Sequence, residues 1–256
     1  MDTVNYDNIA EGYNLRYQRS YQADGLLKKL HDIAIINKSK RVLEVGCGTG
    51  HWLKSFPNDT TIIGLDASFG MLKEAKSKKY RPLLLQGNSN LLPFRKNSFD
   101  FIYCVNAIHH FDQPMKFIQN CKNLLVSGGI IAIVCMNPHS GTDKWFIYDY
   151  FKGTYQMDLS RYPAPEKIKD WLGTAGFKNI DFQIAERLQN KYVDKEVFPI
   201  PKDFTSQLSL LSDHDYRVGI QKIKDSIALT NSRNQKVEFI VDISLSMATA
   251  YKSESD

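Results

Sequence analysis

The sequence predicts an α/β fold of the doubly wound kind, in which helices cover both faces of a mostly parallel sheet. Between residues 40 and 136, short apolar runs alternate with segments of helical periodicity, as buried parallel strands and their connecting helices do. The first apolar run ends in a glycine-rich turn, and polar residues follow several later runs. Because ligands bind beyond the carboxyl ends of such strands, this edge of the sheet is the predicted site.

The predicted core elements follow one another in a regular order. Each predicted strand is a short, mainly apolar run, which is typical of a strand buried on both faces. A Ser-Gly-Gly sequence at residues 127–129 predicts a turn into the fifth strand. The five core strands are expected at residues 41–45, 61–65, 83–86, 99–105 and 130–136, and the core helices at residues 51–56, 68–78 and 115–125.

The region after residue 136 predicts the rest of the sheet. Residues 137–163 are rich in aromatic side chains and predict no regular element. Residues 164–175 predict a helix, because a proline suits its first turn and a glycine follows its end. Two further strands, at residues 177–186 and 237–251, complete a seven-stranded sheet whose C-terminal strand is antiparallel.

A helical insertion separates these last two strands. It covers residues 187–236, with helical periodicity at 205–211 and 215–229. We expect this insertion and residues 137–163 to form lid segments on the substrate side of the sheet, and residues 1–39 to form N-terminal cap helices.

Length and composition predict one globular domain. A chain of 256 residues is long enough for a single large α/β domain, so residues 1–256 are expected to form one unit. Hydrophobic residues make up 43% and charged residues 24%, close to the average for globular proteins. The net charge of +5 is small, and the lysines at 73–79 and 191–195 are interleaved with acidic and apolar residues. This pattern favours solvated helix faces over a nucleic-acid footprint.

The sequence shows no pattern of export, membrane insertion or metal binding. The N-terminus lacks a basic region followed by an apolar core. The longest apolar stretch, residues 130–136, is far shorter than the ~20 residues of a membrane-spanning helix. Four scattered cysteines without a C-x-x-C pair predict buried free thiols in a reducing compartment. We therefore expect a cytoplasmic protein with no metal site.

The glycine-rich turn is the most informative part of the chain. Residues 42–50 read Val-Leu-Glu-Val-Gly-Cys-Gly-Thr-Gly, so Glu44 precedes three alternating glycines, Gly46, Gly48 and Gly50. Glycine lets the backbone turn tightly and approach a ligand closely, because a side chain would occupy the ligand's space. The third glycine falls one residue earlier than in the G-x-G-x-x-G fingerprint, which disfavours an NAD enzyme.

Residues 40–136 resemble the class I S-adenosylmethionine (SAM)-dependent methyltransferases, in particular enzymes with a methyltransferase type 11 domain. Besides the glycine turn, three stretches match in order and spacing: Gly-Leu-Asp-Ala-Ser at 64–68, Gln-Gly-Asn-Ser-Asn-Leu-Leu-Pro-Phe at 86–94 and Ser-Phe-Asp-Phe-Ile-Tyr-Cys-Val-Asn-Ala-Ile-His-His-Phe at 98–111. The resemblance implies a Rossmann-like fold with a SAM-binding core at 40–136. It also implies SAM as cofactor and S-adenosylhomocysteine (SAH) as product.

The resemblance also implies a set of cofactor-binding residues. A carboxylate at the end of the second strand is placed to accept hydrogen bonds from both ribose hydroxyls, or to cap the following helix. Asn88 stands where the family usually has an acidic residue for the adenine amino group, which predicts a weaker, uncharged hydrogen bond. Tyr6 and Tyr13 share a helical face and either close the SAM pocket or pack on the sheet. The implied set is Glu44, Gly46, Gly48, Gly50, Asp66, Ala67, Asn88, Asn106 and Tyr13.

No residue type singles out a catalytic base. SAM carries an activated methyl group, so the protein's task is to bind it, exclude water and align the acceptor. His109 and His110 are the first candidates for a base, with His139, His214 and the tyrosines at 148–155 as others. Two neighbours on a helix point about 100° apart, so His109 and His110 are not expected to face the site together.

The expected reaction is methyl transfer from SAM to a small-molecule acceptor. The aromatic residues at 145–162 and the helical insertion favour an apolar or aromatic acceptor under a lid. One alternative is a transfer RNA wobble-base methyltransferase, since that group shares a similar N-terminal stretch and an Ile-His-His tract. The other is a SAM-binding module without transfer activity, suggested by Asn88 and the lack of an obvious base. A monomer or a homodimer is expected.

Overall fold

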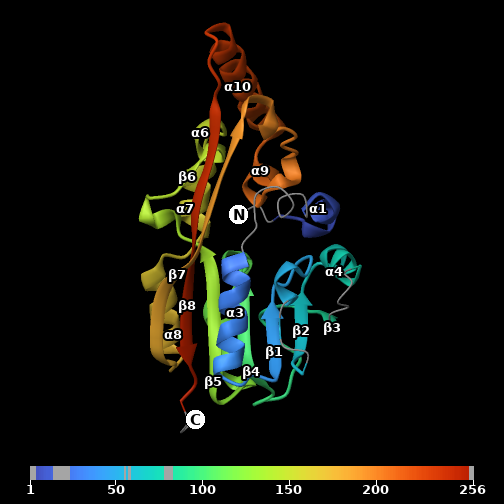
Figure 1. Ribbon diagram of the computed structural model, residues 1–256. Coiled ribbons are helices and arrows are strands. Elements are labelled where there is room, and N and C mark those ends of the chain that lie inside the picture. Colours follow the sequence, from blue (N-terminus) through green and yellow to red (C-terminus); the bar gives the residue numbers. More distant parts are fainter. Residues whose placement is uncertain (1–3, 14–23, 55, 57–58, 78–82, 254–256) are drawn as a thin grey trace.

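Figure 1 shows a mixed sheet with a group of helices beyond the carboxyl ends of its parallel strands. This computed structural model describes residues 4–13, 24–54, 56, 59–77 and 83–253. The helices beyond the sheet lie along two strands that extend far past the others. The predicted α/β class, with a mostly parallel sheet and an antiparallel C-terminal strand, is confirmed.

The parallel part of the sheet has the order β3-β2-β1-β4-β5. Its strands are β1 (Arg41–Val45), β2 (Thr61–Asp66), β3 (Leu83–Gln86), β4 (Phe99–Val105) and β5 (Leu125–Met136). The chain winds outward from β1 to β3 and then returns to place β4 on the other side of β1. Such a reversal opens a crevice at the carboxyl ends of the two central strands, which is where doubly wound folds bind ligands.

Two long antiparallel strands extend the sheet on the other side. β8 (Glu238–Tyr251) pairs with β5 along Leu245–Tyr251 only, whereas β7 (Lys178–Val193) pairs with β8 over its whole length. The far half of this β7–β8 hairpin therefore projects beyond the parallel strands (Figure 1). A two-residue strand, β6 (Lys144–Trp145), pairs with the projecting half of β8.

These strands differ from the prediction in two respects. The described sheet has eight strands, because β6 was not expected, and β7 continues to Val193 where the predicted strand ended at residue 186. The extension is mostly polar and half-exposed, with Leu188 as its one buried apolar residue. Its stability comes from pairing with β8, which a local hydrophobic pattern does not reveal.

Helices and turns complete the lower part of the molecule. The helices α3 (Asp24–Ile36), α4 (Phe69–Lys76), α5 (Pro114–Leu124) and α8 (Pro165–Thr174) lie against the sheet or one another. The expected helix at 51–56 is reduced to a single 3₁₀ turn, η1 (His51–Leu53), because Lys54 is already extended and no side chain caps the turn. The expected turn at 127–129 lies within β5 as a bulge, where Gly128 and Gly129 pair with Lys252.

The aromatic segment 137–163 contains regular secondary structure, although none was predicted there. It contains η3 (Pro138–Ser140), β6, α6 (Phe146–Tyr150) and α7 (Thr154–Arg161). Phe146 packs edge-on against Phe239 of β8, and Phe151 stacks on Tyr216, with ring centroids 6.0 Å apart in both pairs. Much of the aromatic content thus forms a second packing layer beneath the projecting hairpin. The sequence of this segment predicted an irregular loop because its packing partners lie far away in the sequence.

The predicted insertion is helical. After η4 (Asp194–Val197) and η5 (Lys202–Phe204) come α9 (Ser206–Leu210) and α10 (Asp213–Ser232), close to the expected helices. Thr205 and Ser212 cap these two helices, each accepting a hydrogen bond from a backbone N–H of the first turn. The N-terminal helix α1 (Tyr6–Tyr13) packs against α4 and η5. Among the described residues, no helix is both long and apolar enough to cross a membrane.

Candidate functional site

A cavity of about 810 Å³ lies at the carboxyl ends of the central parallel strands. This volume is within the range of about 300–1,000 Å³ that is typical of small-molecule sites. One side, the strand-end half, is formed by the turns after the strands and includes Gly46, Gly48, Asp66, Asn88 and Asn106. The other side, the helical half, is formed by α1, α7, α9 and the turn η2 (Ile108–His110), and includes Tyr6, His110, Met157, Arg161 and Leu210.

The glycine turn presents its backbone to the cavity. All three glycines have positive φ, with values of 75° at Gly46, 52° at Gly48 and 77° at Gly50. A Cβ at Gly46 would collide with the side chain of Ala107, whereas a Cβ at Gly48 would meet no atom within 4 Å. Gly48 therefore borders open space that a ligand can fill. Gly50 does not line the cavity; it precedes η1.

Asp66 ties the glycine turn to the end of β2. Its Oδ2 accepts a hydrogen bond of 2.7 Å from the Gly48 N–H, and its Oδ1 accepts one of 2.9 Å from the Ser68 N–H. Burial raises the pKa of this carboxyl, although these backbone donors act in the opposite direction. The cap of α4 is Ser68, whose Oγ accepts from the Met71 N–H. Asp66 lines the cavity, and its oxygens retain lone pairs for further donors.

Glu44 does not line the cavity, in contrast to the expectation that it binds cofactor. Side chains alternate along a strand, and Glu44 is fully buried within the protein. The Tyr103 hydroxyl donates to its Oε2 at 3.2 Å. Burial raises the pKa of Glu44 well above its ordinary value, so the neutral form is favoured. Glu44 is thus an interior residue and not part of the described cavity wall.

Ala67 and Asn88 lie next to Asp66 along the cavity wall. The Asn88 side-chain oxygen accepts a hydrogen bond of 2.7 Å from the Asn90 N–H, which forms a local turn. The amide oxygen expected to receive the adenine amino group thus already has one donor. A second lone pair remains on that oxygen for a ligand.

Asn106 closes the strand-end half after β4. It has a φ of 49°, which asparagine tolerates better than most residues. Its N–H donates to the Val134 carbonyl, and its Oδ1 accepts a long hydrogen bond of 3.3 Å from the Met136 N–H. These bonds fix the end of β4 against the end of β5. Asn106 lines the cavity, as predicted.

The N-terminal helix α1 covers the cavity. Asp7 Oδ1 accepts hydrogen bonds of 2.7 Å from the Gly70 N–H and the Ser68 hydroxyl, at the start of α4, and these bonds lower its pKa. Tyr6 and Tyr13 lie on one face, as their spacing predicts, with ring centroids 5.9 Å apart. Both tyrosines line the cavity. Of the two roles considered for them, the geometry favours closing the pocket.

Both histidines of η2 line the cavity, so the expectation that only one would face it is wrong. They belong to a single 3₁₀ turn, and their ring centroids are only 3.9 Å apart, so the separation expected for neighbours on an α-helix does not apply. His109 stacks on Tyr162 with ring centroids 3.9 Å apart. The other candidate bases, His139, His214 and the tyrosines at 148–155, do not line this cavity.

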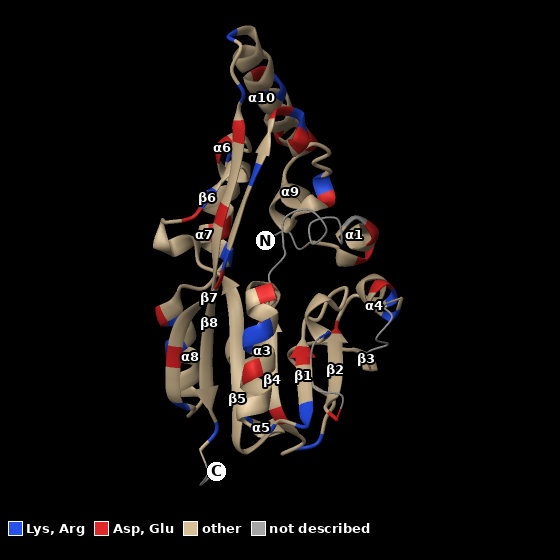
Figure 2. Cartoon of the chain, in the orientation of Figure 1, with Lys and Arg blue, Asp and Glu red and all other residues tan. Residues whose placement is uncertain are grey.

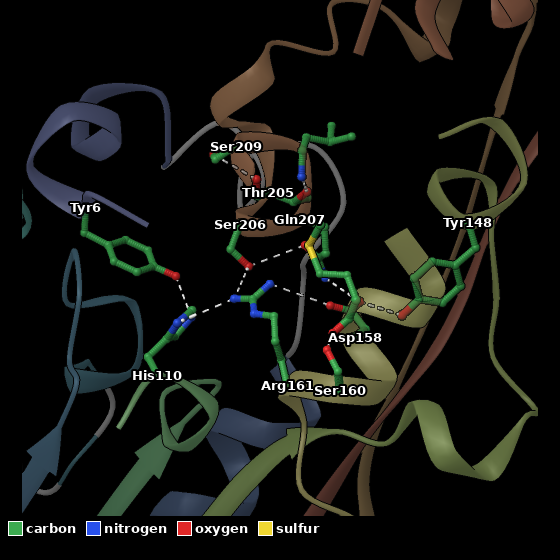
Figure 3. Close-up of polar contacts among 12 residues, drawn as sticks. Tyr6, His110, Tyr148, Asp158, Ser160, Arg161, Thr205, Ser206, Gln207 and Ser209 are labelled. Carbon is green, nitrogen blue, oxygen red and sulfur yellow. Dashed lines mark hydrogen bonds and ion pairs between the residues drawn. The ribbon is translucent and has the colours of Figure 1, made fainter. Parts of the chain in front are cut away.

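His110 is held from both sides, as Figure 3 shows. Its Nε2 lies 2.6 Å from the Tyr6 hydroxyl, and its Nδ1 lies 3.5 Å from Nη2 of Arg161. Because a guanidinium only donates, Nδ1 is the acceptor, and the proton of the neutral ring is on Nε2. Both ring nitrogens are engaged within the protein, so this arrangement does not present His110 as a proton acceptor for a substrate.

Sequence reasoning missed the contribution of α7 and α9. Met157, Ser160 and Arg161 of α7 and Leu210 of α9 line the helical half. Arg161 has only 10% of its side chain exposed, and its Nη2 donates to Ser206 Oγ at 3.2 Å. The Asp158–Arg161 spacing on an amphipathic segment is a signal for a helix, but nothing local shows that it faces the cavity.

Asp158 organises the polar contacts behind Arg161 (Figure 3). Its Oδ2 accepts hydrogen bonds from Tyr148 at 2.8 Å and from Gln207 at 2.6 Å. Burial raises the pKa of this carboxyl to about 6, although the two hydrogen bonds and Arg161 favour the charged form. Asp158 thereby joins α7 to α6 and to α9.

Comparison with known proteins places this geometry in a family. A family model described as a methyltransferase domain matches residues 43–133. An uncharacterized protein of Methanocaldococcus jannaschii is 31% identical over 235 residues, which cover 81% of this chain and 88% of the relative. A SAM-dependent methyltransferase structure from Thermotoga maritima superimposes with a TM-score of 0.60 at 17% identity, covering 97% of this chain and 98% of the other. At that identity the likeness shows the fold.

Two further relatives are named for their activities. Demethylmenaquinone methyltransferase of Shouchella clausii is 24% identical over 202 residues, covering 68% of this chain and 84% of that enzyme. The tRNA U34 carboxymethyltransferase of Pseudoalteromonas atlantica is 26% identical over 150 residues, covering 56% of this chain and 46% of that enzyme. This chain belongs to the class I SAM-dependent methyltransferases. It is an enzyme whose cofactor is SAM, and the expected family and cofactor are confirmed.

The residues of the strand-end half fit this cofactor. Gly48 leaves open the space that a Cβ would fill. Beside it, the buried Thr49 hydroxyl has no hydrogen-bond partner among the described residues, and it lines the cavity. A buried polar atom of this kind is normally satisfied by a ligand or water. Together with the Asp66 carboxylate, the turn offers polar groups and a smooth backbone surface to a nucleoside.

Proposed function

We propose that this enzyme transfers a methyl group from SAM to a small-molecule acceptor bound in the helical half of the cavity. The observation that carries the proposal is that the cavity has two walls: the strand ends form one, and α1, α7 and α9 form the other. A volume of about 810 Å³ leaves room for a small acceptor beside the cofactor.

The strand-end half is proposed to hold SAM. Asp66 would accept from the ribose hydroxyls, and Ala67 and Asn88 would border the adenine. Gly46 and Gly48 would admit the cofactor's tail, and Asn106 would contact its methionine portion. Tyr13 would help to cover the cofactor, while Glu44 and Gly50 would act by shaping the turn. This support comes from the residues' positions on one cavity wall.

The helical half is proposed to position the acceptor. The bound cofactor supplies an activated methyl group, so the chain's own residues must orient the acceptor and exclude water. Met157 and Leu210 provide apolar surface, whereas Tyr6, His109 and Arg161 provide polar groups. Both nitrogens of His110 are engaged, so this arrangement does not present His110 to receive an acceptor's proton. The aromatic residues of 145–162 contribute less than expected, since many pack inside the protein.

The charge distribution favours a small acceptor over transfer RNA. Figure 2 shows lysine and arginine alternating with acidic residues along α3, α10 and the hairpin among the described residues, rather than gathering in one basic stripe. Binding to a nucleic-acid backbone requires such a stripe. The wall made by α1, α7 and α9 also restricts the acceptor side of the cavity.

The release of SAH from SAM tests this proposal. We would screen small aromatic, apolar and acidic acceptors together with bulk transfer RNA, and expect turnover with a small acceptor. Met157→Trp, which fills the helical half, should lower kcat/KM by about tenfold or more without changing SAH affinity. Gln156→Trp, at an exposed neighbouring position of α7, is the matched control. Turnover with transfer RNA alone would contradict the small-acceptor proposal, and SAH binding without any turnover would favour a binding module.

A further inference from the structure

We infer that Arg161 binds an oxyanion of the methyl acceptor, a carboxylate or a phosphate, and so makes the enzyme selective for acidic acceptors. The inference rests on the proposed function, because it assigns one group of the substrate in the helical half. Arg161 is the last residue of α7 and lines the cavity with most of its side chain buried. Among the described residues that line this cavity, it is the only lysine or arginine.

The hydrogen bonds of Arg161 are incomplete within the protein. A guanidinium has five N–H donors. Nη2 contacts two neutral acceptors, Ser206 Oγ at 3.2 Å and His110 Nδ1 at 3.5 Å. Nη1 is buried and has no hydrogen-bond partner among the described residues. Buried cations are normally paired and hydrogen-bonded, so this donor set indicates a missing acceptor.

Asp158 is close to Arg161 but does not supply that acceptor. Its Oδ1 lies 3.8 Å from Nη1, which is an ion-pair distance and too long for a hydrogen bond. Its Oδ2 is turned toward Tyr148 and Gln207. Asp158 Oδ1 itself has no hydrogen-bond partner among the described residues. The carboxylate therefore holds the guanidinium in place without occupying its donors.

The charges along the cavity would orient an acidic acceptor. Asp66 of the strand-end half and Asp7 of α1 both line the cavity next to the start of α4, where both accept hydrogen bonds from backbone N–H groups. The exposed Asp112, which follows η2, is the third carboxylate among the described lining residues. Arg161 lies in the helical half beside His110, whose other ring nitrogen contacts Tyr6. An acceptor with an anionic group would be repelled from the first region and attracted to the second. The nucleophilic group of the acceptor that receives the methyl group would then point toward the cofactor.

The planar fork of arginine suits this role. Two parallel N–H donors match the two oxygens of a carboxylate or phosphate, which a lysine does not reproduce. Arg161 also joins α7 to α9 through Ser206, so an acceptor bound here would contact a residue already fixed on both sides. A purely structural arginine would show no preference among ligands, and this separates the two roles experimentally.

Calorimetric titration of the enzyme–SAH complex tests the inference. The probes are benzoate and phenyl phosphate, with benzamide as the neutral analogue of benzoate. We expect at least one anion to bind more tightly than benzamide. Arg161→Met should weaken the binding of that anion by about 10- to 100-fold, as expected for the loss of hydrogen bonds to a charged group. Arg161→Lys should restore only part of the affinity.

Three controls make the result decisive. Arg217→Met removes an exposed arginine of α10 and should not change the affinity for benzoate or phenyl phosphate. SAH affinity and the urea midpoint of each variant report whether the protein is still folded. If wild-type protein fails to bind SAH, the proposed function fails. If it binds SAH but prefers neither anion over benzamide, or if Arg161→Met retains that preference, the inference about Arg161 is overturned.

Discussion

In the strand-end half of the cavity, main-chain hydrogen bonds hold the lining residues in place. In the helical half, side chains from helices far apart in the sequence hold one another. Gly48, Asp66 and Asn106 are held by main-chain hydrogen bonds at the ends of paired strands. Tyr6, His110, Arg161 and Asp158 are held by one another. The first arrangement tolerates changes elsewhere in the fold, and the second depends on every element that contributes to it.

This difference separates two kinds of recognition. In our proposal the cofactor would meet a surface that the parallel register of β1 and β2 defines. An acceptor particular to this enzyme would meet α1, α7, α9 and η2, whose sequences can vary without disturbing the sheet. Substitutions in each half should therefore change different measurements.

The largest expected effect is at Asp66. Asp66→Ala removes the carboxylate that holds the Gly48 and Ser68 N–H groups and that we propose binds ribose. Loss of charged hydrogen bonds should weaken SAM and SAH binding by about 100-fold or more, measured by calorimetric titration. Asp59→Ala, which removes an exposed carboxylate paired with Lys40 before β2, should leave affinity unchanged. Equal affinities for wild type and Asp66→Ala would remove Asp66 from the site.

An effect of up to similar size, on stability rather than on cofactor affinity, is expected from the titration of Asp158 in the helical half. Its pKa is about 6 in the folded protein, against about 3.9 for a solvated aspartate. Between these values the folded state binds more protons than the unfolded state, so the free energy of unfolding falls as pH rises. The fall should amount to about 3 kcal/mol at most between pH 4 and pH 6.

Asp158→Asn tests this pH dependence, because an amide does not titrate. Urea unfolding from pH 4 to pH 7 should show a shallower fall for the variant than for wild type. Asp170→Asn, on the exposed side of α8, is the matched control and should follow wild type. A variant slope as steep as that of wild type would mean that another buried group controls the stability in this range.

The smallest effect is predicted for alanine in place of two glycines, of which Gly48 lines the cavity and Gly128 does not. Gly48 and Gly128 both have positive φ, and neither has an atom within 4 Å of an added Cβ. Alanine at either position should cost about 1–2 kcal/mol in the free energy of unfolding, because the left-handed backbone is strained. Gly48→Ala alone should also weaken SAH binding, since its methyl group enters the cavity. If both variants bind SAH equally well, Gly48 does not contact the cofactor.

The strand-end half was predictable because its signals are local. Strands 41–45, 83–86 and 99–105 have the expected bounds, since buried parallel strands are short apolar runs bounded by turns. Gly46, Gly48, Asp66, Asn88 and Asn106 were expected at the strand ends and do line the cavity. Glu44 was expected in the same set but does not line the cavity, because sequence spacing does not show that this side chain is fully buried.

The helical half was not predictable, because its contacts join distant parts of the chain. Arg161 meets His110 and Ser206, which lie 51 and 45 residues away. The segment containing Arg161 was expected to be irregular, and its helix α7 is stabilised by packing against α6, α9 and η3. A pattern of aromatic residues indicated burial correctly but could not distinguish a protein core from a substrate pocket.

The projecting β7–β8 hairpin brings the two ends of the segment between its strands together. Residues 194–237 leave and re-enter the sheet at Val193 and Glu238, which are directly paired neighbours. A segment whose ends are held side by side can be inserted without altering the pairing of the two strands. This segment also packs against α1, α6 and α7, so a replacement would have to preserve those contacts. Replacing it would exchange Ser206, Gln207 and Leu210 together while leaving every residue of the strand-end half in place. We therefore expect that exchanging this one contiguous segment would alter the α9 side of the proposed acceptor site and leave α7 and the strand ends unchanged in sequence.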